Sequence, residues 1–297
     1  IVAYDGEYGT TNNPSYYPSD TVPQYAFYDI NEMYPDGGIS LKSIILPNSI
    51  KAINFSAFNY CLNLKHITIP EGVVYIGDNA FDYCQSLSDI QLPSSLKTIS
   101  NYAFNNCINL QNINLPDSLN SIGEYAFNYC YSIDSVFVPE GITTISNGAF
   151  SETGIKYLSL PSTLRIIYND AFSNCTSLKS LKIPASVDSI SDNAFINCSS
   201  LRFVFCERSY PIDMNYSLNA FSSIANPCYL YVPYDNISVY QSSAVWQNFN
   251  YIYNHYEIEV GPGDLISLLD SYQLENIGSL KIIGTIVPRK SFISCLF

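Results

Sequence analysis

A 23-residue repeat runs through the middle of this chain and constrains its fold more than any other feature. Seven consecutive units between residues 41 and 200 follow the pattern L-x-x-I-x-L-P-x-x-L-x-x-I-x-x-x-A-F-x-x-C-x-x. The units begin at Leu41, Leu64, Leu87, Leu110, Ile133, Ile155 and Leu178. The unit that begins at Ile133 is one residue shorter, and it has Thr153 where the others have cysteine. A repeat of this length is typical of a solenoid, in which each unit packs only on its neighbours.

The order of residues within one unit predicts a short strand followed by a return segment. The last two apolar positions of L-x-x-I-x-L are two apart, as a strand with one buried face requires. Proline at position seven has no backbone N–H, so the strand should end there. No single unit can bury its apolar groups alone, so stacked units should share one interior. We therefore expect one continuous aromatic column made of Phe58, Phe81, Phe104, Phe127, Phe150, Phe172 and Phe195.

The pattern loosens at both ends, as is typical where a solenoid closes its core. Residues 1–40 are predicted to form an N-terminal capping region, in which Tyr25-Ala26-Phe27 is the corner of a partial unit. Residues 41–200 hold the seven repeats, and residues 201–254 hold a degenerate repeat and an aromatic C-terminal cap. Residues 255–297 differ in character. A helix beginning at Asp264 and a strand over 280–287 indicate the start of a further small module or a tail.

Most of the nine cysteines recur with the period of the repeat. Cys61, Cys84, Cys107 and Cys130 are 23 residues apart, as are Cys175 and Cys198. This spacing favours a stack of small, buried, reduced thiols. A zinc site gathers its ligands, often as Cys-x-x-Cys pairs, and no two cysteines are that close, so we expect no metal. Cys206, Cys228 and Cys295 lie outside the stack, and whether any of them forms a disulfide stays open.

Charge and hydropathy argue against nucleic-acid binding and against a membrane-spanning helix. The net charge is −13, from 13 Lys and Arg against 26 Asp and Glu, so the chain should repel phosphate backbones and bind no nucleic acid. No apolar run reaches the roughly 20 residues that a membrane-spanning helix needs. The chain opens at Ile1 with neither an initiator methionine nor a leader, so we expect a processed product.

The repeat resembles the leucine-rich repeat of BspA-like bacterial surface proteins over roughly residues 25–254. The strand-proline motif, the Ala-Phe corner and the cysteine step carry the resemblance, together with Leu230-Tyr231-Val232-Pro233, Trp246 and Phe249, which are similar to the family's C-terminal cap. The resemblance implies an α/β leucine-rich-repeat solenoid that is right-handed and curved, with mostly short parallel strands and irregular or 3-10 return segments. It also implies an extracellular place at the bacterial surface, on the outer membrane. Some members are lipoproteins, anchored through an N-terminal segment that this sequence lacks, and some are adhesins.

Residue types typical of catalysis do not gather anywhere in the sequence. The two histidines, His66 and His255, are far apart, and His66 occupies a strand position that should face solvent. No nucleophile elbow, phosphate-binding loop or metalloprotease motif occurs. Asp89 and Asp134 are two repeats apart, about 10 Å at ~4.8 Å per strand, which is the upper limit for a glycosidase pair. We therefore expect no catalytic residue, no cofactor and no enzyme activity.

Positions three and five of each unit should face solvent, because position four is buried. Towards the C-terminal end these positions gather aromatic residues, and position two adds basic ones. The candidate partner-binding face consists of Phe137, Tyr157, Lys156, Lys179, Lys182, Arg202, Phe203 and Phe205. In the alternative interpretation the lysine stems cover apolar edges, while Phe203 and Phe205 pack under the C-terminal cap.

Three functions agree with these features. The first is a non-catalytic cell-surface binding protein or adhesin that presents the solenoid face to a protein of a host or another cell. The second is a module that binds host or dietary carbohydrate, with Tyr157 stacking on a sugar ring beside the amides of Asn112 and Asn114. The third is a structural spacer for other surface modules.

Overall fold

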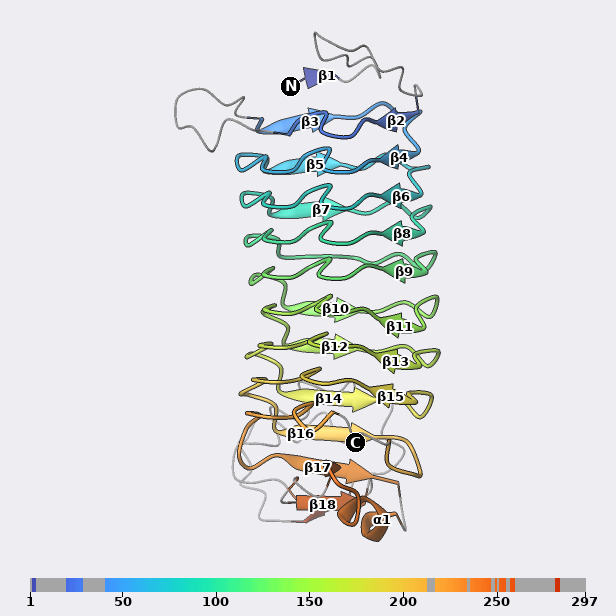
Figure 1. The fold of residues 1–297 in the computed structure, drawn as a ribbon, viewed down its shortest axis with the longest axis vertical. Helices are drawn as coiled ribbons and strands as arrows, with labels where there is room; N and C mark the ends of the chain where they lie inside the picture. The colour runs from blue at the N-terminus through green and yellow to red at the C-terminus, as the bar shows by residue number, and fades with distance from the viewer. Residues whose placement is uncertain are drawn as a thin grey trace, which may run out of the picture.

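The computed structural model describes residues 20–28, 41–212, 217–233, 236–246, 249 and 251–254, together with the backbone of short strands at 2–3, 257–259 and 281–283. These residues wind into coils stacked along one long axis, and the strands form two columns (Figure 1). All the strand pairs are parallel. The solenoid that the repeat predicts is therefore confirmed.

The first column contains the strands that the L-x-x-I-x-L motif predicts. It consists of β1 (Val2–Ala3), β3 (Ser43–Ile45), β5 (His66–Thr68), β7 (Asp89–Gln91), β10 (Ser135–Phe137), β12 (Tyr157–Ser159), β14 (Ser180–Ile183), β16 (Phe203–Cys206), β17 (Tyr229–Val232) and β18 (Tyr251–Asn254). Equivalent residues pair across neighbouring coils, so that Ile44 lies opposite Ile67 and Ile67 lies opposite Ile90. The coil of Asn112 contributes only an isolated bridge to Asp89.

The return segments form a second column of two-residue strands, where the sequence predicted irregular or 3-10 structure. These strands are β2 (Thr21–Val22), β4 (Ala52–Ile53), β6 (Tyr75–Ile76), β8 (Thr98–Ile99), β9 (Ser121–Ile122), β11 (Thr144–Ile145), β13 (Ile166–Ile167) and β15 (Ser189–Ile190). In each strand the second residue is buried in the core while the first is only partly buried or exposed. Two residues are too few for a sequence pattern to distinguish such a strand from a loop.

Within the described ranges α-helix is confined to α1 (Ile237–Gln241) beside the last strands of the first column. Beyond the coils, β19 (Glu257–Glu259) pairs with β20 (Lys281–Ile283). The strand expected over 280–287 therefore appears in part. The helix expected from Asp264 lies outside the described residues.

The phenylalanine column forms as the repeat predicts. Neighbouring rings are stacked at centroid distances from 5.0 to 5.6 Å, with interplanar angles of at most 8°. Phe27 stacks on the first ring at 5.0 Å and Phe221 on the last at 5.3 Å, so the column extends one unit beyond each end of the clear repeats. All seven repeat phenylalanines are fully buried, and so are the alanines that precede them. Each ring thus removes a large apolar surface from water and also contacts its own equivalents.

The corner that contains each Ala-Phe pair needs two residues with left-handed backbone, at positions 16 and 20 of every coil. Asparagine, aspartate, serine and tyrosine occupy most of these sites, and the first two tolerate this conformation better than most residues. Gly148 fills position 16 of the fifth coil, where an added Cβ would lie 2.3 Å from the Tyr125 ring. The sequence pattern did not predict this geometry, because the residues that adopt it differ from coil to coil.

The cysteines line the inside of the same corner and are structural. The thiol of Cys84 donates to the carbonyl of Phe58 in the preceding coil at 3.1 Å, and Cys107 makes the same bond to Phe81. In the short coil Thr153 replaces the thiol, and its Oγ1 donates to the carbonyl of Phe150 at 2.8 Å. The eight described cysteines are buried and reduced, Cys206 and Cys228 included. Cys295 lies outside the described residues.

A ladder of buried polar side chains occupies position 19 of the central coils, directly after the phenylalanine. Asn128 donates its Nδ2–H to Asn105 Oδ1 at 3.0 Å, and Asn105 donates in the same way to Asp82 Oδ1 at 2.8 Å. Burial raises the pKa of Asp82 to about 6, although the bond from Asn105 opposes this shift. On the other side of Asp82 lies Asn59, whose buried Oδ1 has no hydrogen-bond donor. Asp82 is therefore a carboxylic acid at a position where both neighbouring coils have asparagine.

Replacing a ring of the column should destabilise the whole stack. Phe127→Ala should lower the free energy of unfolding by about 3–5 kcal/mol, because it leaves a cavity between two stacked rings. Phe137→Ala removes the same atoms from an exposed strand position, and it should cost only about 0.5 kcal/mol or less. Urea unfolding followed by circular dichroism compares the two variants. Equal losses would contradict a shared aromatic interior.

The position of Asp82 in an amide ladder predicts a pH-dependent stability. Its pKa rises from 3.8 to about 6 on folding, so the stability it contributes is complete below pH 3.8 and is lost as the pH rises through 6. Asp82→Asn should therefore match the parent protein near pH 4 and exceed its unfolding free energy at pH 7.5 by about 2–3 kcal/mol. Denaturant titrations at the two pH values measure the difference.

Asp117→Asn is the matched control, because it removes the same charge from an exposed turn. Its effect on stability should be small and should change little between the two pH values. A gain from Asp82→Asn that is the same at both pH values would show that the ionisation of Asp82 does not limit stability.

Candidate binding face

The solvent-facing side of the first strand column follows the predicted alternation. In β5 and β7 the central isoleucine is buried, while the residues on either side are exposed. The N-terminal part of the face is polar, with exposed His66, Thr68, Asp89, Gln91, Asn112 and Asn114. Parallel strands of adjacent coils hold these side chains in fixed rows. The face is therefore a rigid surface whose chemistry changes along the axis.

Two large aromatic side chains stand exposed on the central strands of this face. Phe137 on β10 is 58% exposed and Tyr157 on β12 is 44% exposed. The register pairs Ser135 with Tyr157 and Phe137 with Ser159, so each ring has a serine as its cross-strand neighbour. The two rings lie on a diagonal of one strand pair, and neither serine is large enough to cover them. Phe137 and Tyr157 thus form the accessible aromatic part of the candidate face.

Phe203 and Phe205 do not belong to the accessible face, and the prediction that they are exposed is wrong. They are only 2% and 6% exposed. Phe203 stacks on Tyr229 at 5.7 Å, and Phe205 stacks on Tyr231 at 4.8 Å. The reason is that β17 and β18 add tyrosines at the outward positions beside β16, so these rings form a second hydrophobic cluster. The alternative interpretation, packing at the C-terminal end, describes them better.

The basic residues of the candidate face differ in how far they are neutralised. Lys156 Nζ lies 3.8 Å from Asp134 Oδ2, and Lys182 Nζ lies 2.8 Å from Glu207 Oε1. Such exposed pairs stabilise a fold by at most about 1 kcal/mol, but they reduce the local positive charge. Lys179 is exposed and forms no ion pair with any residue in the described ranges. Lys156, Lys179 and the half-buried Arg202 occupy position two of three consecutive coils.

A second charged cluster lies on the return side and was missed in the sequence. Asp188 Oδ2 lies 2.8 Å from Arg165 Nε, and Asp188 Oδ1 lies 2.9 Å from a terminal guanidinium nitrogen of Arg208. The hydrogen bond from Arg208 and the charge of Arg165 lower the pKa of Asp188. Arg208 comes after the clear repeats, so no spacing rule connects it with the other two residues.

Groups that could perform chemistry are dispersed. In the part of the chain that the structure describes, no three His, Cys, Asp or Glu side chains come close enough to hold a metal ion. His66 and Asp89 are exposed on neighbouring strands, and Asp134 bonds to Ser135 and Lys156. Burial raises the pKa of the Cys84 thiol well above its usual range, and it raises that of Cys228 to about 12. These thiols are therefore protonated at neutral pH.

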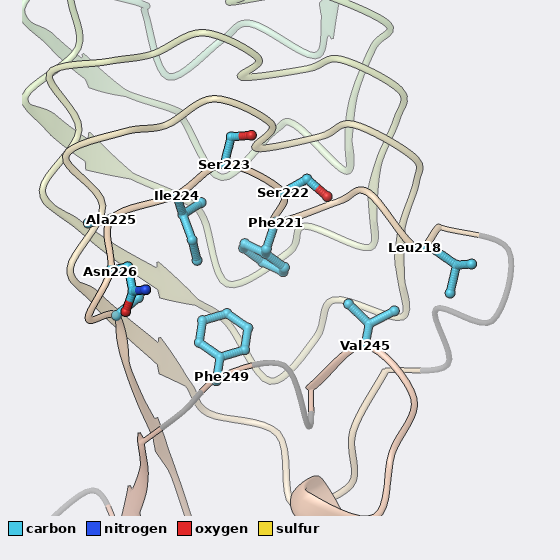
Figure 2. Close-up of a pocket in the computed structure, with 10 residues that line it drawn as sticks. Leu218, Phe221, Ser222, Ser223, Ile224, Ala225, Asn226, Val245 and Phe249 are labelled. Carbon is cyan, nitrogen blue, oxygen red and sulfur yellow. The ribbon is translucent and has the colours of Figure 1, made fainter.

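A cavity of about 250 Å³ lies where the phenylalanine column meets the C-terminal cap. Figure 2 shows Phe221 and Phe249 pointing towards one another across it, with Val245 and Leu218 on one side. Ser222, Ser223 and Asn226 are the polar residues among its lining. Sequence reasoning missed this cavity because its walls come from a loose repeat and from the cap.

Comparisons with known proteins agree with this fold. The model of the BspA type leucine rich repeat region matches the chain in six copies, over residues 20–153, 97–226 and 143–250. No curated protein is a significant match. The crystal structure of a leucine-rich repeat protein from Bacteroides ovatus is similar, with a TM-score of 0.57 and 22% identity, and the match covers 87% of this chain and 74% of that one.

Two further solved structures match with lower TM-scores. The leucine rich repeat protein of T. pallidum is 29% identical, with a TM-score of 0.51, over 54% of this chain and 78% of that one. A leucine rich cell surface protein from Faecalibacterium prausnitzii is 18% identical over 85% of this chain and 87% of that one, with a TM-score of 0.27.

Leucine-rich repeats of this type are generally non-catalytic binding scaffolds, and the family includes bacterial surface proteins. No helix among the described residues is long and apolar enough to cross a bilayer. The family model covers residues 20–250 without interruption, and the coils have the strand, corner and core that the repeat predicts. The chain therefore belongs to the BspA-type leucine-rich-repeat family.

Proposed function

We propose that this protein is a non-catalytic binding protein of the bacterial cell surface that presents its strand face to a protein partner. One observation carries the proposal most directly: Phe137 and Tyr157 stand exposed on adjacent strands, and each has a serine as its partner on the other strand. Exposed aromatic residues held by a rigid backbone are the usual anchors of protein interfaces, because they bury a large area at a small entropic cost.

The charges around these rings favour a partner with an acidic contact segment. Lys179 lies one coil beyond Tyr157 and has no ion-pair partner among the described residues, and Lys156 precedes Tyr157 directly. The chain as a whole carries a net charge of −13, so this small basic area stands out against its surroundings. Such an area steers an acidic segment into one orientation and disfavours basic partners.

The family supports a place at the cell surface, where a binding role is useful. In this proposal residues 201–254 close the C-terminal end of the solenoid, and residues 255–297 begin a further module. A carbohydrate ligand fits the strand face less well. Ser135 on β10 separates Tyr157 from Asn112 by one more coil, and the exposed ring of Phe137 on the same strand offers a sugar hydroxyl no hydrogen bond.

A triple variant tests the proposal. Phe137→Ser, Tyr157→Ser and Lys179→Ser together should weaken capture of a protein partner by about 100-fold, because they remove two anchors and one orienting charge. Surface plasmon resonance against a panel of purified extracellular host proteins gives the affinities. The circular dichroism spectrum and the melting temperature should change little, since all three side chains are exposed.

A matched control lies on the polar half of the same face. His66→Ser, Gln91→Ser and Asn114→Ser change three exposed residues in the N-terminal part of the face, and binding should persist. Equal loss in both triple variants, or no loss in the first, would remove the aromatic area from the interface. A panel that is silent towards the parent protein would favour the spacer role.

A further inference from the structure

The corner of each repeat donates two backbone hydrogen bonds to the next coil along the axis. The N–H at position 18 donates to the carbonyl at position 17 of the next coil, and the N–H at position 20 donates to the carbonyl at position 19. Phe195 N–H reaches Ala220 O at 2.8 Å, and Asn197 N–H reaches Ser222 O at 2.9 Å. The same two bonds leave every one of the seven repeats. These bonds form a corner ladder that runs in one direction along the axis.

The corner ladder ends at Phe221 and Ser223, the equivalents of Phe195 and Asn197 one coil further. Ser223 and Asn197 both have a φ of 58°, so the N–H of Ser223 is oriented as in the repeats. Beyond these residues the C-terminal cap takes the place of a further coil. Neither the N–H of Phe221 nor that of Ser223 finds an acceptor among the residues that the structure describes. Two backbone donors with the spacing of the repeat are therefore left at the end of the ladder.

The cavity of about 250 Å³ lies where the corner ladder ends. Phe221 and Ser223 line it, together with the buried side chains of Val245 and Phe249 from the cap. Figure 2 shows Ile224 and Phe249 reaching towards Phe221 from two sides. Ser223 is exposed, so the cavity is open to solvent at its rim. The two donors and an apolar interior therefore belong to one accessible site.

Volume and charge restrict what this cavity can hold. An apolar cavity of roughly 150 Å³ is enough to bind benzene, so this one has room for a substituted ring. The described residues that line it include no Asp, Glu, Lys, Arg or His. Burial raises the pKa of the Cys228 thiol in its wall to about 12, so that group is neutral as well. A charged group would lose its hydration here without a counter-charge, whereas an uncharged ring can pack against Phe221 and Phe249.

We propose that the cavity binds the aromatic side chain of a peptide segment whose backbone carbonyls accept hydrogen bonds from Phe221 and Ser223. In the repeats the two accepting carbonyls flank a phenylalanine, as those of Ala220 and Ser222 flank Phe221. A peptide that makes the same two bonds therefore places the side chain of its middle residue beside Phe221. A free aromatic molecule would fill the cavity but leave both donors unpaired, so a peptide satisfies the site better.

This site is independent of the strand face, so the two proposals can fail separately. The variant with Phe137→Ser, Tyr157→Ser and Lys179→Ser leaves every residue of the cavity unchanged, and it should bind the peptide as the parent does. Loss of peptide binding with intact capture of a protein by the strand face would concern the cavity alone.

The only tryptophan of the chain reports on the cavity, because the ring centroids of Trp246 and Phe221 are 5.7 Å apart. Acetyl-Ala-Phe-Ser-amide copies the corner at residues 220–222. Its titration should change the fluorescence of Trp246 in a saturable way, and it should move the amide proton resonances of Phe221 and Ser223 downfield. Acetyl-Ala-Lys-Ser-amide lacks the ring and toluene lacks the carbonyls, so each should bind at least about tenfold more weakly.

A larger side chain in the wall of the cavity tests the location. Ala225→Leu should weaken binding of acetyl-Ala-Phe-Ser-amide by at least about tenfold, because the added atoms take up space that the ring needs. Ala185→Leu is the matched control, since it makes the same change at an exposed residue outside the cavity, and it should bind as the parent does. Circular dichroism checks that both variants fold.

Three results would overturn the proposal. The first is a parent protein whose fluorescence and two amide resonances stay unchanged at millimolar peptide. The second is binding of toluene or of the lysine peptide as tight as that of the phenylalanine peptide. The third is undiminished binding to a folded Ala225→Leu variant. If that variant does not fold, the amide resonances of Phe221 and Ser223 in the parent decide.

Discussion

The fold depends on the register between coils, which places almost every side chain against its own equivalent about one strand spacing away. A residue type can occupy such a file only if it packs favourably on itself. Phenylalanine stacks on phenylalanine at 5.0 to 5.6 Å, and an amide donates to the amide of the next coil. Buried charges cannot do this, because equal charges in a file repel one another, whereas Lys156, Lys179 and Arg202 follow one another at a position that water reaches. This requirement explains a chain with only 13% charged residues that uses Asn, Ser and Tyr for its polarity. Asp82 is the exception, and its raised pKa reflects the conflict.

Functional residues are expected at positions where the residue type departs from the repeat, because a residue that recurs in every coil contributes to the packing between coils. Phe137 and Tyr157 interrupt rows of mostly polar residues on the strand face. At each of these two positions an aromatic side chain is exposed where the other coils mostly have a polar one. The coils hold these groups on a backbone fixed by bonds to both neighbours, so a ligand would meet a preorganised surface. Burial keeps the thiols of Cys84 and Cys228 protonated, so these two side chains serve packing.

The C-terminal end shows how a cap changes surfaces that the repeat alone would leave open. The eighth coil places Phe203 and Phe205 on outward strand positions, yet β17 and β18 bring tyrosines beside them and bury both rings. Phe221, Trp246 and Phe249 then end the phenylalanine column with tilted and edge-on contacts in place of parallel ones. These rings do not occupy equivalent positions of neighbouring coils, so they do not stack in parallel. The cavity between Phe221 and Phe249 lies where the parallel stacking ends.

The sequence by itself determined the coil, the buried strand position, the phenylalanine column and the cysteine stack. Each of these depends on residues that recur with the period and therefore meet their equivalents, so one unit predicts its neighbours. Tertiary structure alone decided the second strand column, the two left-handed positions at the corner and the burial of Phe203 and Phe205. It also decided the pairing of Lys182 with Glu207 and of Asp188 with two arginines. The second strand column and the left-handed positions recur with the period, but the residue types there differ from coil to coil and show no pattern. Arg165 and Asp188 are also one period apart, yet opposite charges at that position do not recur. Glu207, Arg208 and the tyrosines that cover Phe203 and Phe205 come from beyond the clear repeats, so no period relates them to their partners.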